Sequence, residues 1–563
     1  MKFTEYSYSR PDMGAYSAMF VGLLESFERA GTAEEQSRRL ADICRARIEF
    51  ETTYQLAVVR HTQDTTVPDY AAEQQFFDEN KPLYDELVSR FYARLVRSRF
   101  RGELEERWGR HLFALAELSL NVVSPAVLDD LGEENRLVSE YNKLLASARI
   151  AFKGQERNLS GMQQFLVSDE RETRRLAAEA KWGFFSENAG RFDDIFDRLV
   201  QVRTRIARKL GYPGFVELAY ARLMRTDYDA GMVAGLRAEV ERHLVPLLSQ
   251  LKREQAARLG LPRMDYYDEA LDFRGGNPGP KGGAGWIVEQ SQRMFAEMSA
   301  ETREFFNFML ENELMDLLTR PGKASGGYCV DFKQYGAPFI FANFTGTSID
   351  VDILTHEAGH AFQNYQSRHF EAPEYRWPTL DACEIHSMSM EYFAWPWMHL
   401  FFAEETDKFR YAHVTTSVHY LCYRAAIDEF QHFVYEHPEA TPGERKQAWL
   451  ALENRYLPDR NFAGNEFLRQ GGGWQQQLHV YAAPFYFIDY NLAEMCAFQF
   501  WAKSEEDWGG GWADYLRLCR AGGSASFLQL VELSGLASPF SEGHVEALAG
   551  RLRTWLSAAA ARL

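Results

Sequence analysis

The sequence predicts a mostly helical protein, and three observations support this fold class. Apolar residues recur at helical spacing, with charged residues between them, over 14–60 and 70–150. Strand-like alternation is scarce in the first 320 residues, although 47–64 could form either a helix or a strand. Gly and Pro gather in a few short breaks, as loops require. We therefore expect one large helical body with little β-structure.

The breaks divide this helical pattern into parts. We expect a loop over 272–286, where Gly and Pro dominate, and a second break over 319–332. The segment FIFANF, 339–344, is rich in β-favouring residues and is predicted to be a strand. A further Gly cluster at 468–477 should interrupt the C-terminal helices. We place the domain boundary near residue 190, with a helical N-terminal lobe over 1–190 and a second helical region over 191–563.

Charge and cysteine content narrow the range of partners and compartments. The net charge is −18 with a pI near 5.4, so neither nucleic acid nor an anionic membrane surface is an expected partner. The sequence has no apolar run of about 18 residues, and its first residues do not resemble a secretory signal. Six scattered cysteines without a CxxC pair indicate reduced thiols. We therefore expect a cytoplasmic protein.

One short motif contains candidate metal ligands and a candidate general base. The letters HEAGH place His356 and His360 four residues apart, with Glu357 between them. On a helix the two imidazoles share a face and can both reach one Zn²⁺ at about 2.0–2.1 Å. Glu357 would lie beside the ligands, where a general base must be to accept a proton from water. Because short motifs also match by chance, the surrounding sequence must decide.

The segment around HEAGH has the features of a helix. Ser348 or Asp350 could cap its N-terminus, and apolar residues follow at helical spacing. Gly359 is unfavourable inside a helix by about 1 kcal/mol relative to Ala. We expect a compensating reason for it, and the close packing of another segment near the metal is one.

A catalytic zinc site needs a third protein ligand and an open position. The segment 379–395 offers Glu384 and Glu391, which are seven residues apart and share a helical face. Glu384 could instead complete a capping box after Asp381. Its position 24 residues after His360 favours the ligand role. His386 would face roughly the other way, so packing or hydrogen bonding is its expected role.

With these residues in place, the sequence resembles the thimet oligopeptidase and oligoendopeptidase F family of zinc peptidases. The likeness covers about 326–394 and 479–500, and the length suits the oligoendopeptidase F branch. It implies a deep substrate channel in the helical body, with the small sheet beside the metal-site helix. It also implies one Zn²⁺ per chain and short peptide substrates. The implied roles are zinc ligands for His356, His360 and Glu384, general base for Glu357, and orientation of a ligand imidazole for Glu391.

The family resemblance also gives meaning to an aromatic segment at 477–495. Tyr486 and Tyr490 are four residues apart and could simply form a packing stripe. In related enzymes a His and tyrosines from this region lie over the metal, where hydroxyls donate to the oxyanion of the reacting peptide. We slightly favour Tyr490 over Tyr486 for this role, and His479 ranks close behind them. The segment departs from the family pattern at Phe485, Phe487 and Ile488.

Two further segments could contact a peptide. Gly326, Gly327 and Tyr328 could form a loop that closes on the substrate backbone, or a plain turn. The predicted strand 339–344 could pair with an extended peptide, or lie inside the sheet without a free edge.

The sequence leads to one main functional hypothesis and two rivals. The main hypothesis is a zinc-dependent endopeptidase that cuts internal bonds of short, unstructured peptides. A zinc carboxypeptidase on a similar scaffold is the first rival, and it would need a cation for the terminal carboxylate, such as Arg376, Arg424 or Arg469. A non-catalytic peptide-binding protein with a vestigial site is the second rival.

Overall fold

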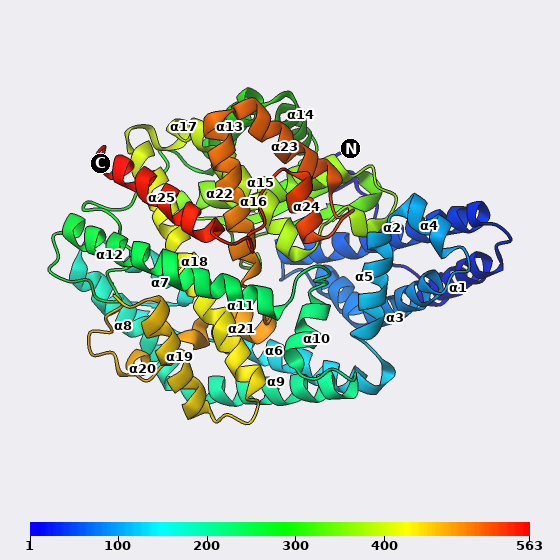
Figure 1. Cartoon of the computed structure of the whole chain (residues 1–563), viewed down its shortest axis with the longest axis horizontal. Helices are drawn as coiled ribbons and strands as arrows, with labels where there is room; N and C mark the ends of the chain where they lie inside the picture. Colours follow the sequence, from blue (N-terminus) through cyan, green and yellow to red (C-terminus); the bar gives the residue numbers. More distant parts are fainter.

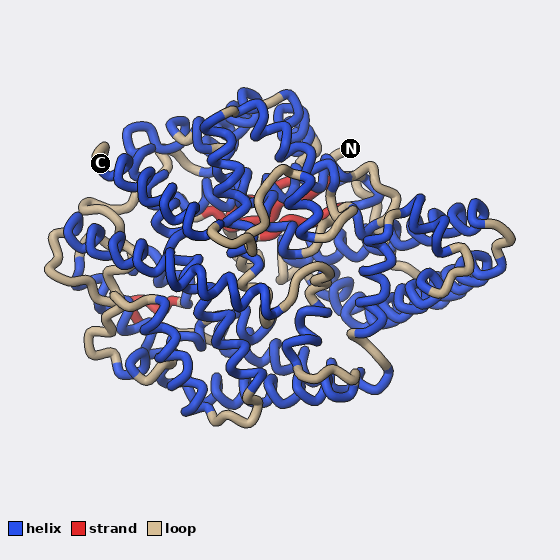
Figure 2. The backbone as a smooth tube through the Cα atoms, viewed as in Figure 1, coloured by secondary structure: helices blue, strands red, loops and turns tan.

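The computed structural model describes all 563 residues, and helices make up most of the chain (Figure 1, Figure 2). The first helices form a lobe that projects from one side of the molecule (Figure 1). Their bounds are α1 Met13–Arg29, α2 Ala33–Gln63, α3 Pro68–Val96, α4 Arg101–Trp108 and α5 Arg110–Asn121. The ambiguous segment 47–64 is helical, because it lies in α2 as far as Gln63.

Local sequence explains where three of these helices begin. The side chains of Asp12 and Thr32 accept hydrogen bonds from the first turns of α1 and α2. Pro68 occupies the first position of α3, where its missing N–H costs nothing. Residues 20–116 have an apolar core of their own, which the body joins through Ala372 and Tyr375. The proposed division at residue 190 stays a prediction.

The rest of the chain forms a larger helical body around one extensive core. Its first helices are α6 Leu128–Ala146, α7 Leu159–Leu166, α8 Arg171–Glu187, α9 Ala189–Lys209, α10 Phe215–Arg222, α11 Ala230–Glu239, α12 Val245–Leu259, α13 Ala284–Met298 and α14 Ala300–Glu311. The later ones are α15 Ser348–Ser367, α16 Leu380–Phe393, α17 His399–Phe402, α18 Thr406–Glu436, α19 Pro442–Tyr456, α20 Glu466–Arg469, α21 Leu478–Ala482, α22 Asp489–Glu506, α23 Trp508–Ala521, α24 Phe527–Leu533 and α25 His544–Ala560.

Two small sheets accompany the helices (Figure 2). The first is a hairpin of β1 Ile150–Phe152 and β2 Gln155–Arg157. The second has the order β3-β5-β4, with β3 Met315–Leu318, β4 Tyr328–Phe332 and β5 Ala337–Phe344. Strand β5 pairs in parallel with β3 and antiparallel with β4. This mostly helical architecture with small sheets is the fold class that the sequence predicts.

The structure decides one alternative that the sequence left open and shortens two of the predicted breaks. The segment 339–344 is a strand, but β5 is the central one, so it has no free edge for an added peptide. The break predicted over 319–332 ends earlier, because 328–332 pairs with β5 as β4. The predicted loop 272–286 is also shorter, since α13 begins at Ala284. The Gly cluster 468–477 does interrupt the helices, between α20 and α21.

Helices α15 and α16 cross in the middle of the body, and α22 packs against α16 (Figure 1). Thr347, rather than Ser348, precedes the first turn of α15. The Asp350 carboxylate accepts from the backbone N–H of Thr345 at 3.0 Å and of Gly346 at 2.6 Å, so it fixes the chain entering the helix. These contacts hold α15 directly after β5.

Gly359 lies where α15 meets α16. A Cβ at this position would be 2.6 Å from the carbonyl oxygen of His386 and 2.6 Å from Cα of Ser387. Both atoms belong to the backbone of α16, so they cannot move aside as a flexible side chain could. The absence of a side chain therefore allows the two helices to approach, as the sequence led us to expect.

We expect Gly359→Ala to destabilise the protein. The better helix propensity of Ala contributes about 1 kcal/mol, but separating two packed helices costs about 1–3 kcal/mol or more. The midpoint of thermal unfolding should therefore fall. Gly235→Ala in α11 is the matched control, because a Cβ there meets nothing within 4 Å and should leave or raise the midpoint. An unchanged midpoint for Gly359→Ala would contradict the tight crossing.

No single helix combines the length and apolar character needed to cross a bilayer. The segments Arg110–Asn121 and Pro125–Ala146 meet the criterion only as a pair, and that pair is bent by 49°.

Candidate metal centre and active site

The crossing of α15 and α16 brings three candidate ligands together. Nε2 of His356 is 3.3 Å and Nε2 of His360 is 3.5 Å from Oε2 of Glu384. All three ligand atoms lie within 4.8 Å of one another. Ligands about 2.0–2.2 Å from a tetrahedral ion are separated by roughly 3.3–3.5 Å. The spacing and the His, His, Glu donor set therefore fit one metal ion.

The electrostatics of the cluster also favour a cation between these groups. Burial alone would raise the pKa of Glu384, but the two imidazoles hold this pKa well below its usual range. Burial would lower the pKa of His356, but hydrogen bonds with Glu384 and Glu391 raise it to about 10. The carboxylates thus stabilise positive charge at the position where a metal ion would be.

A second layer of contacts orients the imidazoles. Nδ1 of His356 is 2.7 Å from Oε1 of Glu391, which leaves Nε2 directed at Glu384. The other Glu391 oxygen is 2.8 Å from Nε2 of His413 on α18. Nδ1 of His360 is 3.3 Å from Sγ of Cys383. Such outer contacts fix the ring orientation and the tautomer of metal ligands.

Glu391 thus makes the contact that the family resemblance implies. Neither His413 nor Cys383 was identified from the sequence. His413 lies 22 residues beyond Glu391 on another helix, so no local spacing pointed to it.

Glu357 has a free carboxylate oxygen beside the ligands. The residue is 8% exposed, and its Oε2 is buried without a hydrogen-bond partner. Burial raises the pKa of Glu357, although the neighbouring imidazoles lower it in part. A buried carboxylate without a partner is costly unless a ligand or water engages it. Its position and its free oxygen suit a group that exchanges a proton with a bound molecule.

The glycine segment before β4 lies against this carboxylate. A Cβ on Gly327 would be 3.8 Å from Oε1 of Glu357 and 3.5 Å from the carbonyl oxygen of Phe341. Gly326 has a φ of +99°, which favours glycine, and its carbonyl accepts from Asn343 at 2.8 Å. The Tyr328 hydroxyl is instead 2.5 Å from Oγ1 of Thr62 in α2, so it is held by the N-terminal lobe. The substrate-binding role of this segment stays a prediction.

The aromatic segment after α21 reaches the same site. The Tyr486 hydroxyl donates to Oε1 of Glu384 at 2.5 Å, and its oxygen is 2.9 Å from the Tyr490 hydroxyl oxygen. The His479 ring is 5.7 Å from the ring of Tyr486 and 6.0 Å from that of Tyr490. All three predicted residues therefore gather beside Glu384. Tyr486 makes the direct contact, and the choice of the oxyanion donor stays a prediction.

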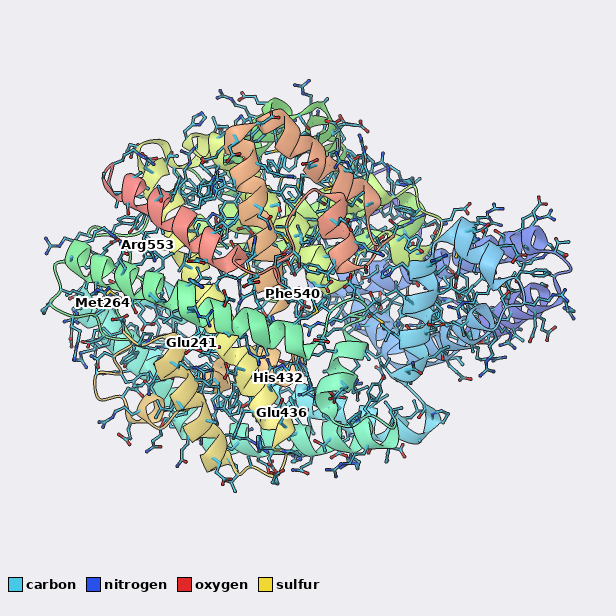
Figure 3. All side chains as sticks on the ribbon, viewed as in Figure 1. Glu241, Met264, His432, Glu436, Phe540 and Arg553 are labelled. Carbon is cyan, nitrogen blue, oxygen red and sulfur yellow. The ribbon has the colours of Figure 1, made fainter.

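The turn that carries Tyr486 is held in an uncommon conformation. Phe485 has a φ of +66°, which is strained for a residue with a side chain. Its N–H donates to Oε1 of Gln431 at 2.9 Å, and its carbonyl accepts from Arg225 at 2.6 Å. Its ring packs edge-on against His432, which is labelled in Figure 3. These contacts fix the backbone just before Tyr486.

Two alternatives from the sequence are resolved by neighbouring contacts. Nδ1 of His386 is 2.9 Å from the carbonyl oxygen of Ala382 and the residue is fully buried, so it packs rather than joining the cluster, as expected. Glu384 does not form a capping box with Asp381. The N-cap of α16 is Thr379, and the Glu384 carboxylate faces the imidazoles and Tyr486.

A helix bearing HEAGH, a Glu from the next helix and an unpartnered carboxylate together define the class of metallopeptidases. Comparison with known proteins supports this class. A family model described as Peptidase M3 N-terminal domain matches residues 3–123, and one described as Peptidase family M3 matches 294–550. No curated protein matches the chain.

Several solved structures resemble the whole chain. One of PZ peptidase A with an inhibitor has 53% sequence identity, a TM-score of 0.95 and 99% coverage of both chains. One assigned as an oligoendopeptidase F has 52% identity, a TM-score of 0.94 and 99% coverage of both. Another so assigned, from Bacillus anthracis, has 49% identity and a TM-score of 0.90, covering 99% of this chain and 98% of the other.

The chain belongs to peptidase family M3. It is a metallo-oligopeptidase, and its substrates are peptides. The family resemblance and the enzyme class predicted from the sequence are therefore confirmed.

Proposed function

We propose that this enzyme is a zinc-dependent endopeptidase that hydrolyses internal bonds of short, unstructured peptides. The observation that carries the proposal is the free Oε2 of Glu357 directly beside the His356, His360 and Glu384 set. Zinc is the metal that this donor set typically binds in peptidases with two His and one Glu. The similar structures assigned as oligoendopeptidase F support the endopeptidase activity.

The proposed mechanism uses the chain's own residues for proton transfer and orientation. When bound by His356, His360 and Glu384, zinc would lower the pKa of water and polarise a carbonyl group. Glu357 takes a proton from the attacking water as the new C–O bond forms. It then gives this proton to the amide nitrogen, so that the C–N bond breaks and a neutral amine leaves.

The aromatic cluster would stabilise the charge that develops on the carbonyl oxygen. The hydroxyls of Tyr486 and Tyr490 are 2.9 Å apart and lie beside Glu384, where one of them can donate to that oxygen. His479 is placed to assist them, because its ring is close to both tyrosines. Glu391 keeps His356 oriented throughout the reaction through the 2.7 Å contact with Nδ1.

Strand β4 is the element that we propose pairs with the substrate backbone. It lies at the edge of the three-stranded sheet, and Tyr328, Cys329 and Val330 are only partly buried. Gly327, at its start, is beside Glu357. An extended peptide added along β4 would gain backbone hydrogen bonds with little dependence on its side chains. Short unstructured peptides can adopt this extended form without unfolding first.

The products of a mixed peptide set test the endopeptidase proposal. We expect mass spectrometry to show cuts at internal bonds, with activity lost on chelation and restored by zinc. Stepwise loss of single residues from the C-terminus would instead indicate a carboxypeptidase. Unchanged peptides, bound equally well before and after chelation, would indicate a binding protein with a vestigial site.

We also propose a cytoplasmic location. All six cysteines are free thiols in the structure, as is usual for proteins of reducing compartments. The acidic net charge of −18 agrees with peptides, rather than nucleic acid, as the partners.

A further inference from the structure

Arg424 is a buried cation beside the aromatic cluster of the active site. It lies on α18 and is 9% exposed. Its guanidinium carbon is 5.1 Å from the ring centre of Tyr490, 5.1 Å from that of Tyr420 and 5.6 Å from that of Phe487. Aromatic faces attract a guanidinium, but they do not satisfy its N–H groups.

The guanidinium of Arg424 has no hydrogen-bond partner in the protein. Its Nε and Nη1 are buried and unpaired. The nearest carboxylate is that of Glu494, whose Oε2 is 4.0 Å away and whose Oε1 accepts from the Tyr392 hydroxyl at 2.7 Å. Nη2 also has no hydrogen-bond partner in the protein, but it is not fully buried. A buried cation with so weak a partner is costly.

Other buried arginines of the body are paired, which makes Arg424 an exception. Arg225 contacts Asp489 at 2.5 Å, and Arg203 contacts Glu134 at 2.7 Å. Of the other arginines considered for binding a carboxylate, Arg376 donates to the backbone carbonyls of Phe370 and Lys333. Arg469 is exposed on α20. Only Arg424 combines burial, an unpaired guanidinium and a place beside the active-site tyrosines.

We propose that Arg424 binds a carboxylate of the peptide substrate and thereby helps to select which peptides are cut. The inference rests on the proposed function, because it assigns a ligand within the same substrate site. Nη2 would donate to a carboxylate oxygen, and the positive charge would strengthen this hydrogen bond in a largely water-free setting. The peptide would thus supply the anionic partner that the protein lacks.

The contacts of Arg424 limit how far its guanidinium lies from the candidate metal ligand Glu384. The path from its guanidinium through Tyr490 and Tyr486 to Glu384 is at most about 14 Å long. An extended peptide covers this distance in about four residues. The carboxylate is therefore either the C-terminus of a short peptide or an Asp or Glu side chain close to the cut. Both sources share the chemistry that Arg424 recognises.

Equilibrium binding to the Glu357→Gln holoenzyme tests the proposal without turnover. One labelled hexapeptide without acidic residues is prepared with an amidated C-terminus, as the uncharged reference. A second form has a free C-terminus, and a third set is amidated with a single Glu at each position in turn. We expect one carboxylate form to bind roughly 10- to 100-fold more tightly than the reference. The form that does so identifies the source of the carboxylate.

Arg424 variants of the Glu357→Gln holoenzyme then test whether Arg424 causes the preference for a peptide carboxylate. Arg424→Gln should remove it, while Arg424→Lys, which keeps the charge, should retain part of it. Arg469→Gln is the matched control and should leave every dissociation constant unchanged. Circular dichroism checks that each variant is folded.

If the protein that retains Arg424 binds all the peptide forms with equal affinity, the proposal is wrong. This test does not depend on whether the Arg424 variants fold. A preference that survives in folded Arg424→Gln would overturn it as well. Because no turnover is measured, failure of the endopeptidase proposal would appear in the product analysis and not in this experiment.

Discussion

Replacing Glu357 by glutamine is expected to reduce kcat by roughly 10²- to 10⁴-fold or more, the range typical of a lost general base. Glutamine keeps the size of the side chain but cannot accept the proton of the attacking water. The buried Oε2 of Glu357 has no other partner in the structure, so its removal breaks no hydrogen bond that supports the fold. Steady-state cleavage of a quenched fluorescent peptide measures the effect.

The same variant should keep its metal and its fold. The three candidate ligands are unaltered, and removing an unpaired buried carboxylate relieves a desolvation cost rather than adding one. The metal content per chain and the thermal unfolding midpoint should therefore match the parent protein. If Glu357→Gln kept substantial activity together with its metal and its fold, the assigned role would be wrong.

Replacing Glu384 by glutamine should have a comparably large effect through a different cause. The variant loses the carboxylate that lies 3.3 Å from His356 and 3.5 Å from His360. We expect metal affinity to fall by more than about 100-fold, because loss of an outer contact alone typically costs 10- to 100-fold. Activity should fall with metal occupancy and return in part when excess zinc is supplied. Titration against a zinc-selective chelator measures the affinity.

Glu391→Gln is the matched control for this variant. Its carboxylate contacts His356 and His413 but not the candidate metal position, so its effect should remain in the 10- to 100-fold range. The assignment of the third ligand would be wrong if Glu384→Gln kept full metal affinity. It would also be wrong if Glu391→Gln lost more metal affinity than Glu384→Gln.

The sequence was sufficient to predict those parts of the molecule that depend on local periodicity. Amphipathic spacing predicted most of the helical N-terminal lobe, including α3 and the first part of α2, but it left 47–64 open between helix and strand. The i, i+4 spacing in HEAGH placed His356 and His360 on one helical face. The helix-like segment 379–395, which follows in the sequence, contained the third candidate ligand, Glu384. Gly359 also pointed correctly to a close crossing, because a glycine inside a helix needs a packing reason.

Features that depend on contacts between distant segments could not be predicted in this way. The Phe485 backbone is strained because Gln431 and Arg225, from two other parts of the chain, hold it from both sides. A phenylalanine gives no local sign of a positive φ. His413 reaches Glu391 only because α18 packs near α16. The central place of β5 likewise depends on which strands flank it, and its own residues do not specify this.

The central claim is that His356, His360 and Glu384 hold the catalytic metal ion. Diffraction from crystals of active enzyme, recorded on both sides of the zinc absorption edge, tests it most directly. We predict one anomalous peak per chain, within about 2.2 Å of Nε2 of both histidines and of a Glu384 oxygen. A peak elsewhere, or no peak in crystals of active enzyme, would contradict the account.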